Sequence, residues 1–298
     1  MNAAIIGSNG YIGRHLSKYW LEQGYQARFF DVNEQSTDHL PNYSSLNLKD
    51  LDAIKQLNFE GTDLIFLLAG LTGTSQAFAN FSQFIDLNEK ALLGILEQMR
   101  ATNPKARIIF PSTRLVYKGA ENTPLKEDAP KEFKTIYALN KFACEQYLQM
   151  YAQYFGINHT IARICVPYGN EMDNSYSFGT IGFFLNKALK NEDITIYGSG
   201  NQKRSLIHIH DLVRALTCVA LAPEAANQTY NLGGNDTLSI ADIAQAIAKK
   251  YDVKLQNTDF PPLDAAIESG DTIFDSSYFE RSFDFEYLQN FKNWLNAI

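Results

Sequence analysis

The sequence predicts an α/β fold, with a doubly wound parallel sheet and a smaller, interleaved C-terminal domain. Short apolar runs that suit buried strands alternate with stretches of helical periodicity, which is the pattern of βαβ units. A glycine-rich turn joins the first strand to the first helix. The chain has 298 residues, of which 45% are hydrophobic, so it can form a large core and more than one domain.

The glycine-rich turn is the first element with a chemical meaning. The apolar run Asn2–Ile6 suits a buried strand, and apolar residues recur at helical intervals over residues 11–20. Gly7, Gly10 and Gly13 have the spacing G-x-x-G-x-x-G. The first glycine permits a tight turn, the second lets the backbone approach a pyrophosphate, and the third lets the helix pack on the strand. The pattern predicts a Rossmann-type dinucleotide site with the phosphates at the helix N-terminus.

A second strand is expected at Gln26–Phe30, and it leads into Asp31, 24 residues after Gly7. An acid at this distance accepts hydrogen bonds from the adenosine ribose. Its charge repels a 2′-phosphate, so Asp31 favours NAD over NADP. Arg28 is a weaker counter-signal, because its side chain should point to the sheet face of Phe30.

The later elements continue the alternation. We expect strands at Leu64–Ala69 and Arg107–Phe110, and helices around Leu87–Met99 and Tyr137–Tyr154. On the last helix, Tyr137 and Lys141 are four residues apart and therefore share one face. A phenol has an ordinary pKa near 10, and a nearby ammonium favours the phenolate.

Five motifs in order resemble those of one family. They are Phe66–Gly70, Asn88 at the start of a long helix, Ser112–Tyr117, Ala162–Gly169 and Gly198–Asp211. With the glycine turn and Tyr-x-x-x-Lys, the chain resembles the extended short-chain dehydrogenase/reductases of the NAD-dependent sugar-nucleotide epimerase/dehydratase family, whose best-known member is UDP-galactose 4-epimerase. The likeness runs from Met1 to about Gly234.

The resemblance implies NAD as the cofactor and a nucleotide sugar as the substrate, and it implies roles for individual residues. The catalytic residues would be Thr113, Tyr137 and Lys141. The cofactor-binding residues would be Gly7, Asn9, Gly10, Tyr11, Ile12, Asp31, Asn47, Leu48, Leu68, Ala69, Gly70, Asn88, Ser112, Tyr137 and Lys141. The positions expected to meet the substrate are Thr72, Arg114, Val166, Arg204 and Asp271.

The chemistry that the resemblance implies is acid–base catalysis combined with hydride transfer by the cofactor. Thr113 would hydrogen-bond the reacting sugar oxygen, and Tyr137 would exchange its proton with that oxygen. Lys141 would hold the tyrosine ionised and bind the nicotinamide ribose.

The chain departs from the family pattern at several positions. Arg114 and Leu115 replace the Asp-Glu pair of the 4,6-dehydratases, so dehydration is disfavoured. Thr72 replaces a lysine of the 4-epimerases, and Val166 replaces a substrate-binding asparagine. Glu268 replaces the arginine of the Arg-x-Gly-Asp segment that clamps the substrate diphosphate. Substrate binding must therefore differ in detail, with Arg204 as the remaining candidate ligand of the diphosphate.

Three functions stay open on this basis. The first is an epimerase that acts through a transient ketone with tightly held NAD, which Asp31 favours. The second is an NAD(P)H-dependent 4-ketoreductase that makes a deoxysugar nucleotide, which the missing asparagine and arginine favour. The third is a non-catalytic sensor or scaffold, and the intact set of Thr113, Tyr137 and Lys141 argues against it.

The domain organisation follows from composition and from the resemblance. A polar stretch rich in turn formers covers residues 169–175. We expect an NAD-binding Rossmann domain at residues 1–169, to which 205–230 returns, and a mainly substrate-binding domain at 170–298.

Charge and composition limit the partners. The formal net charge is −7, with no block of Lys or Arg, so nucleic acid and acidic membrane surfaces are not expected partners. The first strand leaves no room for a signal peptide and no apolar run is of membrane-spanning length, so we expect a cytoplasmic protein. Cys144, Cys165 and Cys218 lack metal or redox spacing, so no metal is expected.

Two further expectations concern surfaces and histidines. The helices around Leu87–Met99 and Phe142–Tyr154 carry more apolar residues than one core-facing stripe needs, and the family counterparts form a four-helix interface; we therefore expect a homodimer. His208 and His210 alternate on an expected strand, where structural hydrogen bonding suits both better than catalysis or metal binding.

Overall fold

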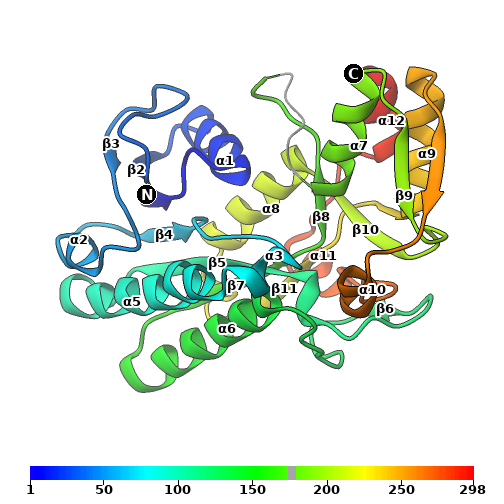
Figure 1. The fold of residues 1–298 in the computed structure, drawn as a ribbon. Helices are drawn as coiled ribbons and strands as arrows, with labels where there is room; N and C mark the ends of the chain where they lie inside the picture. Colours follow the sequence, from blue (N-terminus) through cyan, green and yellow to red (C-terminus); the bar gives the residue numbers. More distant parts are fainter. Residues whose placement is uncertain (174–178) are drawn as a thin grey trace. The chain divides into compact units, whose positions relative to one another are not determined.

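The computed structural model describes residues 1–173 and 179–298, and Figure 1 shows its elements. Backbone contacts divide the chain into two compact units. The first unit comprises Met1–Val116, Thr135–Arg163 and Leu216–Tyr230, and the second comprises Tyr117–Lys134, Ile164–Ala215 and Asn231–Ile298. The expected division into a cofactor domain and a substrate domain stays a prediction. The expected boundary stretch at 169–175 lies partly outside the described residues.

A seven-stranded sheet forms the centre of the first unit, in the order β11-β7-β5-β4-β1-β2-β3. The pairs β1–β2, β1–β4, β2–β3 and β4–β5 are parallel. Its strands are β1 (Asn2–Ile6), β2 (Gln26–Asp31), β3 (Tyr43–Ser45), β4 (Leu64–Leu67), β5 (Arg107–Thr113), β7 (His159–Ile164) and β11 (Gln228–Leu232). The chain order reverses beside β1, so a crevice is expected outside the carboxyl ends of β1 and β4. The doubly wound α/β fold is confirmed.

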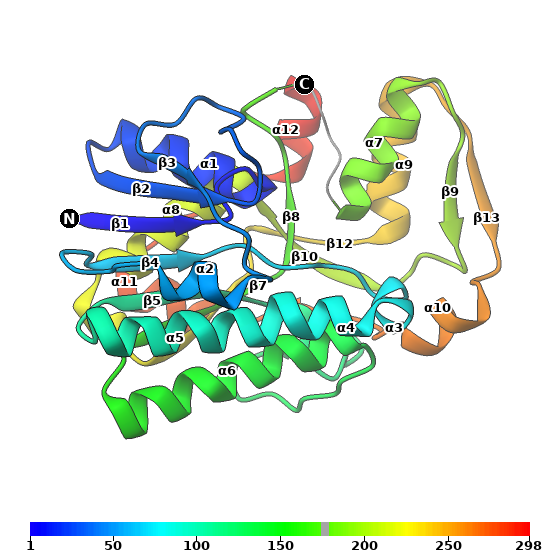
Figure 2. The same ribbon diagram turned by 60° about the vertical axis from the view of Figure 1, so that its left-hand side comes forward.

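Helices cover both faces of this sheet. Figure 2 shows α5 and α6 side by side below the sheet and α1 on the opposite face. The helical segments are α1 (Tyr11–Glu22), α2 (Leu51–Lys55), α3 (Gln76–Ala79), α4 (Phe81–Phe84), the π-helix η1 (Ile85–Lys90), α5 (Ala91–Thr102), the 3₁₀ turn η2 (Arg114–Val116), α6 (Ile136–Phe155), α8 (Ile209–Leu221) and the 3₁₀ turn η3 (Pro223–Ala225). Of α8, only the part from Leu216 onward belongs to the first unit, and its start belongs to the second. The core below the sheet packs Ile95 and Leu148 against Ile6 and Ile108.

The second unit contains small sheets and helices. Its sheets have the orders β12-β10-β8, β13-β9 and β14-β6. The strands are β6 (Pro124–Leu125), β8 (Val166–Tyr168), β9 (Ile194–Tyr197), β10 (Lys203–His208), β12 (Asp236–Ser239), β13 (Leu255–Thr258) and β14 (Ile273–Phe274). The helices are α7 (Gly179–Leu189), α9 (Ile240–Tyr251), α10 (Pro262–Ile267), α11 (Ser277–Phe283) and α12 (Phe291–Ala297). Tyr168, Leu206, Ile247 and Trp294 belong to its core.

Three expected elements differ from the structure. The helix expected around Leu87–Met99 begins as the π-helix η1 and becomes α-helical at Ala91, and the strand expected at Arg107–Phe110 runs on to Thr113. His210 lies in α8 and not on a strand. The physical reason is a cap: the His208 ring accepts a hydrogen bond from the backbone N–H of His210 through Nδ1 at 3.2 Å, which satisfies a donor at the helix start.

Candidate active site

The glycine turn between β1 and α1 leaves no room for a side chain at two of its glycines. Gly7 has φ +97°, and a Cβ there would lie 2.4 Å from the Ala69 nitrogen. A Cβ on Gly13 would lie 1.9 Å from the Gly7 oxygen. Helix α1 begins at Tyr11 without a side-chain cap and without an acidic residue in its first turn. This arrangement suits an anion such as a pyrophosphate.

A cleft of about 440 Å³ lies at the carboxyl ends of these strands, within the first unit. Nine of the expected cofactor residues line it: Gly7, Asn9, Gly10, Asp31, Asn47, Leu48, Leu68, Ala69 and Gly70. The cleft is also lined by residues that the sequence patterns did not indicate: Ile6, Val32, Asn33, Leu46, Lys49, Leu71 and Leu87. Several of these follow β2 and β4, so the rule that ligands bind beyond strand carboxyl ends could have found them. The glycine turn and the cleft fit a dinucleotide.

Asp31 is held in a fixed orientation at this cleft. Its carboxylate accepts hydrogen bonds from the backbone N–H groups of Asn9 at 2.9 Å and Val32 at 2.8 Å. The oxygens keep further lone pairs for ribose hydroxyls. The carboxylate therefore stands where a ribose-binding acid is expected.

Both arginines near this part of the sequence are occupied elsewhere. Arg28 donates to the Asn58 oxygen at 2.7 Å and to Thr62 Oγ1 at 2.9 Å, in the loop that precedes β4. That loop lies at the end of the sheet opposite Asp31, because β2 and β4 are both parallel to β1. Arg14 forms a two-point ion pair with Asp38 at 2.8 and 2.7 Å. Arg28 is therefore held away from Asp31, and a different cation, Lys49, lines the cleft.

Asn88 lies in the π-helix η1 and binds the loop that lines the cleft. Its Oδ1 accepts from the Leu71 N–H at 2.8 Å and its Nδ2 donates to the Leu71 oxygen at 3.0 Å. A Cβ on Gly70 would lie 2.9 Å from Asn88 Oδ1. π-helical turns often mark functional sites. Here the turn directs an amide at the backbone of the cleft.

Tyr137 is buried next to Thr113. Only 8% of Tyr137 is exposed, and its ring packs in a cluster with Ala77 and Phe84 against Leu71, which also lines the cleft. Burial raises the pKa of Tyr137 to about 12, while the hydrogen bond with Thr113 and the charge of Arg114 lower it. Arg114, which was expected to meet the substrate, therefore lowers the pKa of this phenol, whereas the ammonium of Lys141, which was expected to do so, donates to the Pro111 oxygen.

Lys141 lies one turn further along α6 and is also buried. Its Nζ donates to the Pro111 oxygen at 2.8 Å and lies 4.5 Å from the centre of the Phe110 ring. Burial lowers the pKa of Lys141 to about 8, and the neighbouring Cys144 and Glu145 oppose this shift. The ammonium is directed at the end of β5, next to Thr113.

Ser112 is buried, and its hydroxyl is bound to α6. Ser112 Oγ donates to Glu145 Oε1 at 2.5 Å. Glu145 in turn forms a two-point ion pair with Arg163, at 3.0 and 2.6 Å. Glu145 and Arg163 were not expected at this site from the sequence. The helical spacing of Tyr137, Lys141 and Glu145 was the available signal.

The residues expected to meet the substrate fall in both units. Thr72 and Arg114 belong to the first, and Val166, Arg204 and Asp271 belong to the second. Thr72 is exposed, and Val166 packs against the core of the second unit.

Arg204 and Asp271 are engaged within the second unit. Arg204 is buried and donates to Glu268 Oε1 at 2.6 Å and to the Gly270 oxygen. Asp271 accepts from the backbone N–H groups of Lys203 at 2.7 Å and Asn122 at 2.9 Å. The carboxylate of Glu268 therefore neutralises the arginine that was expected to bind the diphosphate.

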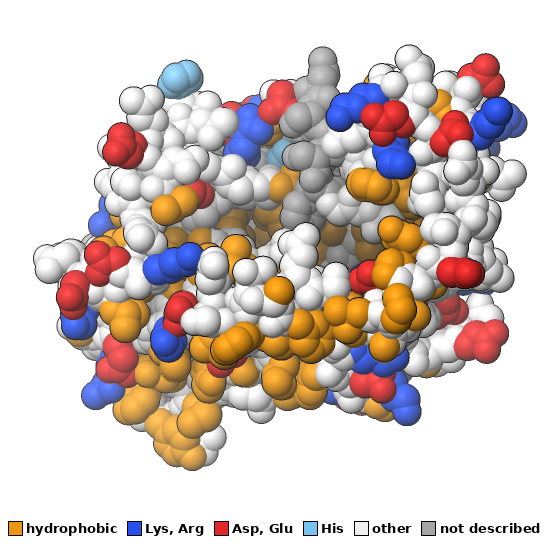
Figure 3. Space-filling model, viewed as in Figure 1, with side chains coloured by type: hydrophobic (Ala, Val, Ile, Leu, Met, Phe, Trp, Pro, Cys, Tyr) orange, Lys and Arg blue, Asp and Glu red, His pale blue; other side chains and the backbone are white. Residues whose placement is uncertain are grey.

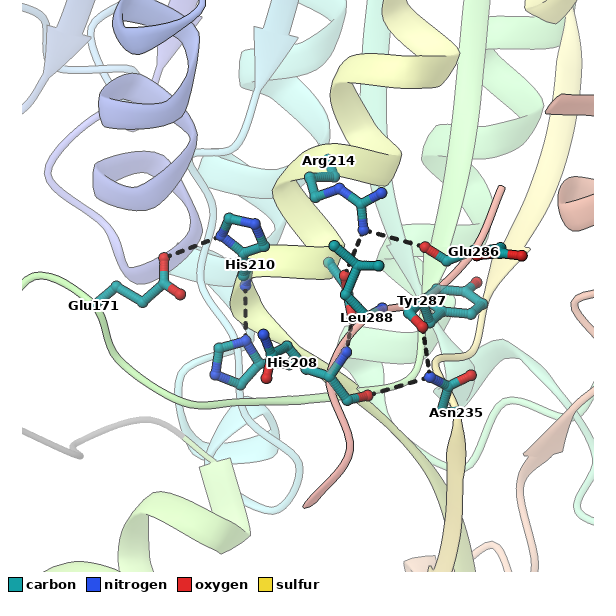
Figure 4. A network of polar contacts seen from close by, with 10 residues as sticks. Glu171, His208, His210, Arg214, Asn235, Glu286, Tyr287 and Leu288 are labelled. Atoms are coloured by element: carbon teal, nitrogen blue, oxygen red, sulfur yellow. Dashed lines mark hydrogen bonds and ion pairs between the residues drawn. The ribbon is translucent and has the colours of Figure 1, made fainter. Parts of the chain in front are cut away.

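His208 and His210 belong to a polar network in the second unit (Figure 4). His210 Nδ1 lies 3.3 Å from Glu171 Oε2. Arg214 donates to the Glu286 oxygen at 3.1 Å. These contacts tie α8 to the segments before α7 and before α12. Within residues 1–173 and 179–298, no group of three His, Cys, Asp or Glu side chains could hold a metal ion.

No helix in the described part of the chain combines the length and apolar character that crossing a bilayer requires.

Comparison with known families identifies the group to which the chain belongs. The model of the NAD-dependent epimerase/dehydratase family matches residues 3–233. The chain therefore belongs to the NAD-dependent epimerase/dehydratase family. This confirms the family inferred from the motifs, an enzyme of this type, and NAD as its cofactor.

Individual relatives agree with this assignment. A protein named putative UDP-glucose 4-epimerase, from Methanocaldococcus jannaschii, is 25% identical over 247 residues, which cover 82% of this chain and 80% of the relative. The dTDP-4-dehydro-6-deoxyglucose reductase of Escherichia coli is 27% identical over 261 residues, which cover 84% and 82%. The structure of Thermus thermophilus UDP-glucose 4-epimerase in complex with NAD superposes with a TM-score of 0.87 at 19% identity, covering 99% of this chain and 96% of that chain. The last likeness supports the fold.

Proposed function

We propose that this member of the NAD-dependent epimerase/dehydratase family is an epimerase of a nucleotide-activated sugar, acting through a transient ketone. The observation that carries the proposal is the hydrogen bond between Tyr137 and Thr113, with Lys141 one helical turn away. Leu71 lines the dinucleotide cleft and packs in the cluster of Tyr137. Acid–base groups beside a dinucleotide cleft suit oxidation and reduction of an alcohol carbon.

The protein side of the mechanism consists of binding and proton transfer. Tyr137 Oη removes the proton of the sugar hydroxyl as the ketone forms, and returns it when the ketone is reduced on its other face. Thr113 donates a hydrogen bond to the same oxygen and holds it beside the phenol. Bound NAD supplies the hydride acceptor and donor. The ammonium of Lys141 would bind the nicotinamide ribose, while Arg114 and Thr113 lower the pKa of the phenol.

The substrate is expected to bind in an unusual way. In it, the first unit binds NAD and the second binds the nucleotide sugar, a substrate class that the names of the relatives support. Because Glu268 neutralises Arg204, a diphosphate at this position must displace a carboxylate or bind through other groups. We therefore expect the diphosphate of the substrate to be bound by groups other than an unpaired arginine.

A second candidate is a 4-ketoreductase. One relative carries the name of such a reductase, and this observation supports the second candidate. The two reactions use the cofactor differently. An epimerase regenerates its NAD in each turnover, whereas a reductase consumes one NADH for each product molecule.

The experiment separates these reactions directly. The purified protein is analysed for co-purified NAD and then incubated with UDP-glucose, UDP-galactose, UDP-N-acetylglucosamine and CDP- and dTDP-hexoses. An epimerised product without change in absorbance at 340 nm supports the epimerase. Loss of NADH with dTDP-4-keto-6-deoxyglucose supports the reductase. Failure with every compound in the panel, in protein that binds NAD, contradicts both.

We also propose that two copies associate through α6 and the helices beside it. Leu139, Met150 and Tyr154 are exposed on α6, and Phe81 is exposed on α4. Leu139, Met150 and Tyr154 are separated by 11 and 4 residues, so they share one face. Figure 3 shows hydrophobic side chains gathered over α5 and α6. A second copy of this face would cover them.

A further inference from the structure

Three consecutive residues at the end of β5 are bound by three successive turns of α6. The Pro111 oxygen accepts a hydrogen bond from Lys141. Ser112 donates to Glu145, and Thr113 is hydrogen-bonded to Tyr137. Tyr137, Lys141 and Glu145 are spaced by four residues, so one helix face meets the whole strand end.

Of these contacts, the one made by Glu145 is the most deeply buried. Glu145 is fully buried and Arg163 is 5% exposed. Arg163 extends from β7, the strand beside β5, and contacts both carboxylate oxygens. Ser112 supplies a third donor to the carboxylate. Three elements, β5, β7 and α6, therefore meet at one carboxylate.

Stability alone does not account for such an ion pair. Desolvation offsets much of the attraction in a buried pair, and well-packed apolar residues of similar volume are often as stable. A two-point ion pair differs from apolar packing in that it fixes the orientation of its partners. At this position, the orientation that it fixes is that of Ser112, the residue between the Pro111 carbonyl and Thr113.

We propose that Glu145 and Arg163 are positioning residues, which hold the end of β5 in register with α6 and thereby set Thr113 and Lys141 relative to Tyr137. This inference rests on the proposed function of those three residues. Glu145 contacts the strand end through Ser112, and Arg163 contacts Glu145. A shift of about 1 Å at the strand end is enough to change turnover on the order of 100-fold.

Two variants remove the link in different ways. Ser112→Ala removes the hydrogen bond to Glu145 and leaves the ion pair intact. The double variant Glu145→Leu with Arg163→Met removes the pair without leaving a lone buried charge, and it keeps Ser112. A single Glu145 or Arg163 substitution is avoided, because one unpaired buried charge can prevent folding.

The matched control lies at the other end of the same strand. Arg107 is buried and donates to the backbone oxygens of Ala220 and Ala222. It precedes Thr113 by six residues, or about 20 Å of strand. Arg107→Met therefore perturbs β5 without touching the contacts at Ser112.

Three measurements are made on each protein. Thermal unfolding reports folding, titration of tryptophan fluorescence with NAD reports binding, and tyrosinate absorbance near 295 nm with saturating NAD reports the ionisation of Tyr137. The signal of Tyr137 is obtained by subtracting the titration of the same protein carrying Tyr137→Phe. Turnover and KM are added with any sugar nucleotide that the parent accepts.

The expected result is the same for Ser112→Ala and for the double variant. The Kd for NAD rises about five-fold, as for the loss of one hydrogen bond. Tyr137 ionises about one pH unit higher, and turnover falls on the order of 100-fold with little change in KM. Arg107→Met lowers the unfolding temperature and leaves the other values at those of the parent.

The inference is overturned when both variants match the parent in NAD affinity and in Tyr137 ionisation. It is also overturned when Arg107→Met changes these values equally, because the effect is then general loss of stability. Failure of the proposed function is distinguishable: a parent whose tyrosinate signal below pH 11 does not depend on Tyr137 contradicts the acid–base role. In that case the NAD affinities of the two variants still decide whether Glu145 and Arg163 position Lys141.

Discussion

Burial sets the acid–base properties of Tyr137 and Lys141 in opposite directions. Desolvation disfavours the charged form of each, so the pKa of Tyr137 rises to about 12 and that of Lys141 falls to about 8. A phenol with this pKa is a poor base at neutral pH. In the proposed acid–base role, Arg114 and Thr113, which lower the pKa of Tyr137, and the charge of a bound nicotinamide would together favour the phenolate.

The first prediction concerns the proton carrier. Tyr137→Phe removes the hydroxyl and retains the ring packing, so NAD affinity should stay nearly unchanged while turnover falls about 10²- to 10⁴-fold. Steady-state rates on the accepted sugar nucleotide and a fluorescence titration with NAD measure both. Thr113→Val is the matched comparison and should lower turnover less, because it removes a hydrogen bond and no proton. Parent-like turnover in the phenylalanine variant means that Tyr137 is not the acid–base group.

The second prediction concerns pH and stability. Because the pKa of Lys141 is about 8 in the folded protein and ordinarily 10.5, the unfolded chain binds the extra proton between these pH values. The contribution of Lys141 to the free energy of unfolding therefore rises with pH between these two values and is constant below pH 8. The difference in unfolding free energy between the parent and Lys141→Met should grow by up to about 1.4 kcal/mol per pH unit. Urea denaturation at pH 7, 8, 9 and 10 measures it, and a difference independent of pH contradicts the buried ammonium.

The third prediction concerns cofactor choice. The carboxylate of Asp31 loses ribose hydrogen bonds and meets a like charge when a 2′-phosphate is present. NAD should bind about 10- to 100-fold more tightly than NADP, as expected for charge-assisted hydrogen bonds. Asp31→Ser should reduce this ratio, and Arg28→Ala should leave it unchanged because Arg28 is bound near Thr62. Calorimetric titrations test all three proteins, and equal affinities in the parent contradict the assignment.

Helix α1 depends on close contact with the strand that precedes it. A Cβ on Gly13 would lie 1.9 Å from the Gly7 oxygen and 2.9 Å from the Ser8 Cα, both backbone atoms that cannot rotate away. The helix start can accept a side chain at this position only by moving. The N–H groups that face the expected pyrophosphate move with it.

The fourth prediction follows from this contact. Gly13→Ala should weaken NAD binding at least about ten-fold and lower the unfolding temperature, because overpacking of this kind costs about 1–3 kcal/mol. Gly24→Ala is a useful comparison: Gly24 follows the end of α1 and has open space around its Cβ position. Gly24→Ala therefore measures the cost of a side chain at a positive φ, here +77°, without a steric clash. Equal NAD affinity in the Gly13 variant and the parent contradicts the close approach.

Sequence patterns located most elements because local periodicity and burial agreed. The strands at β1, β2 and β4 and the helices α1 and α6 were expected within a few residues of their observed bounds. Periodicity could not distinguish η1 from an α-helix. A single π-turn shifts the helical register by only one residue, so the apolar periodicity over such a short segment is nearly the same in both. The start of α8 was missed for a similar reason: the apolar run continues from β10 into the helix.

The fifth prediction concerns the association of two copies of this protein. Leu139→Glu with Met150→Glu places charges on the exposed face of α6, so a dimer formed through this face should dissociate into monomers. Light scattering at micromolar concentration measures the mass. Leu263→Glu, on α10 of the second unit, changes a residue of similar exposure and should leave the mass unchanged. A monomeric parent contradicts the proposed dimer.

The features that could be inferred from the sequence are those that short-range sequence patterns determine. The glycine spacing, the acid that follows β2 and the Tyr-x-x-x-Lys pattern are short-range signals, and they led to the family, the doubly wound fold and NAD. Nine of the expected cofactor residues do line the cleft.

The partners of charged and buried groups depended on contacts between distant parts of the chain. Glu145 with Arg163, and Arg204 with Glu268, are separated by 18 and 64 residues. No local pattern specifies that Arg28 points away from Asp31, or that Ser112 donates to a helix. Such contacts arise when elements pack and desolvated charges must find a partner, because an unpaired buried charge is costly. The tertiary structure therefore determined which arginine is neutralised and where the ammonium of Lys141 is held.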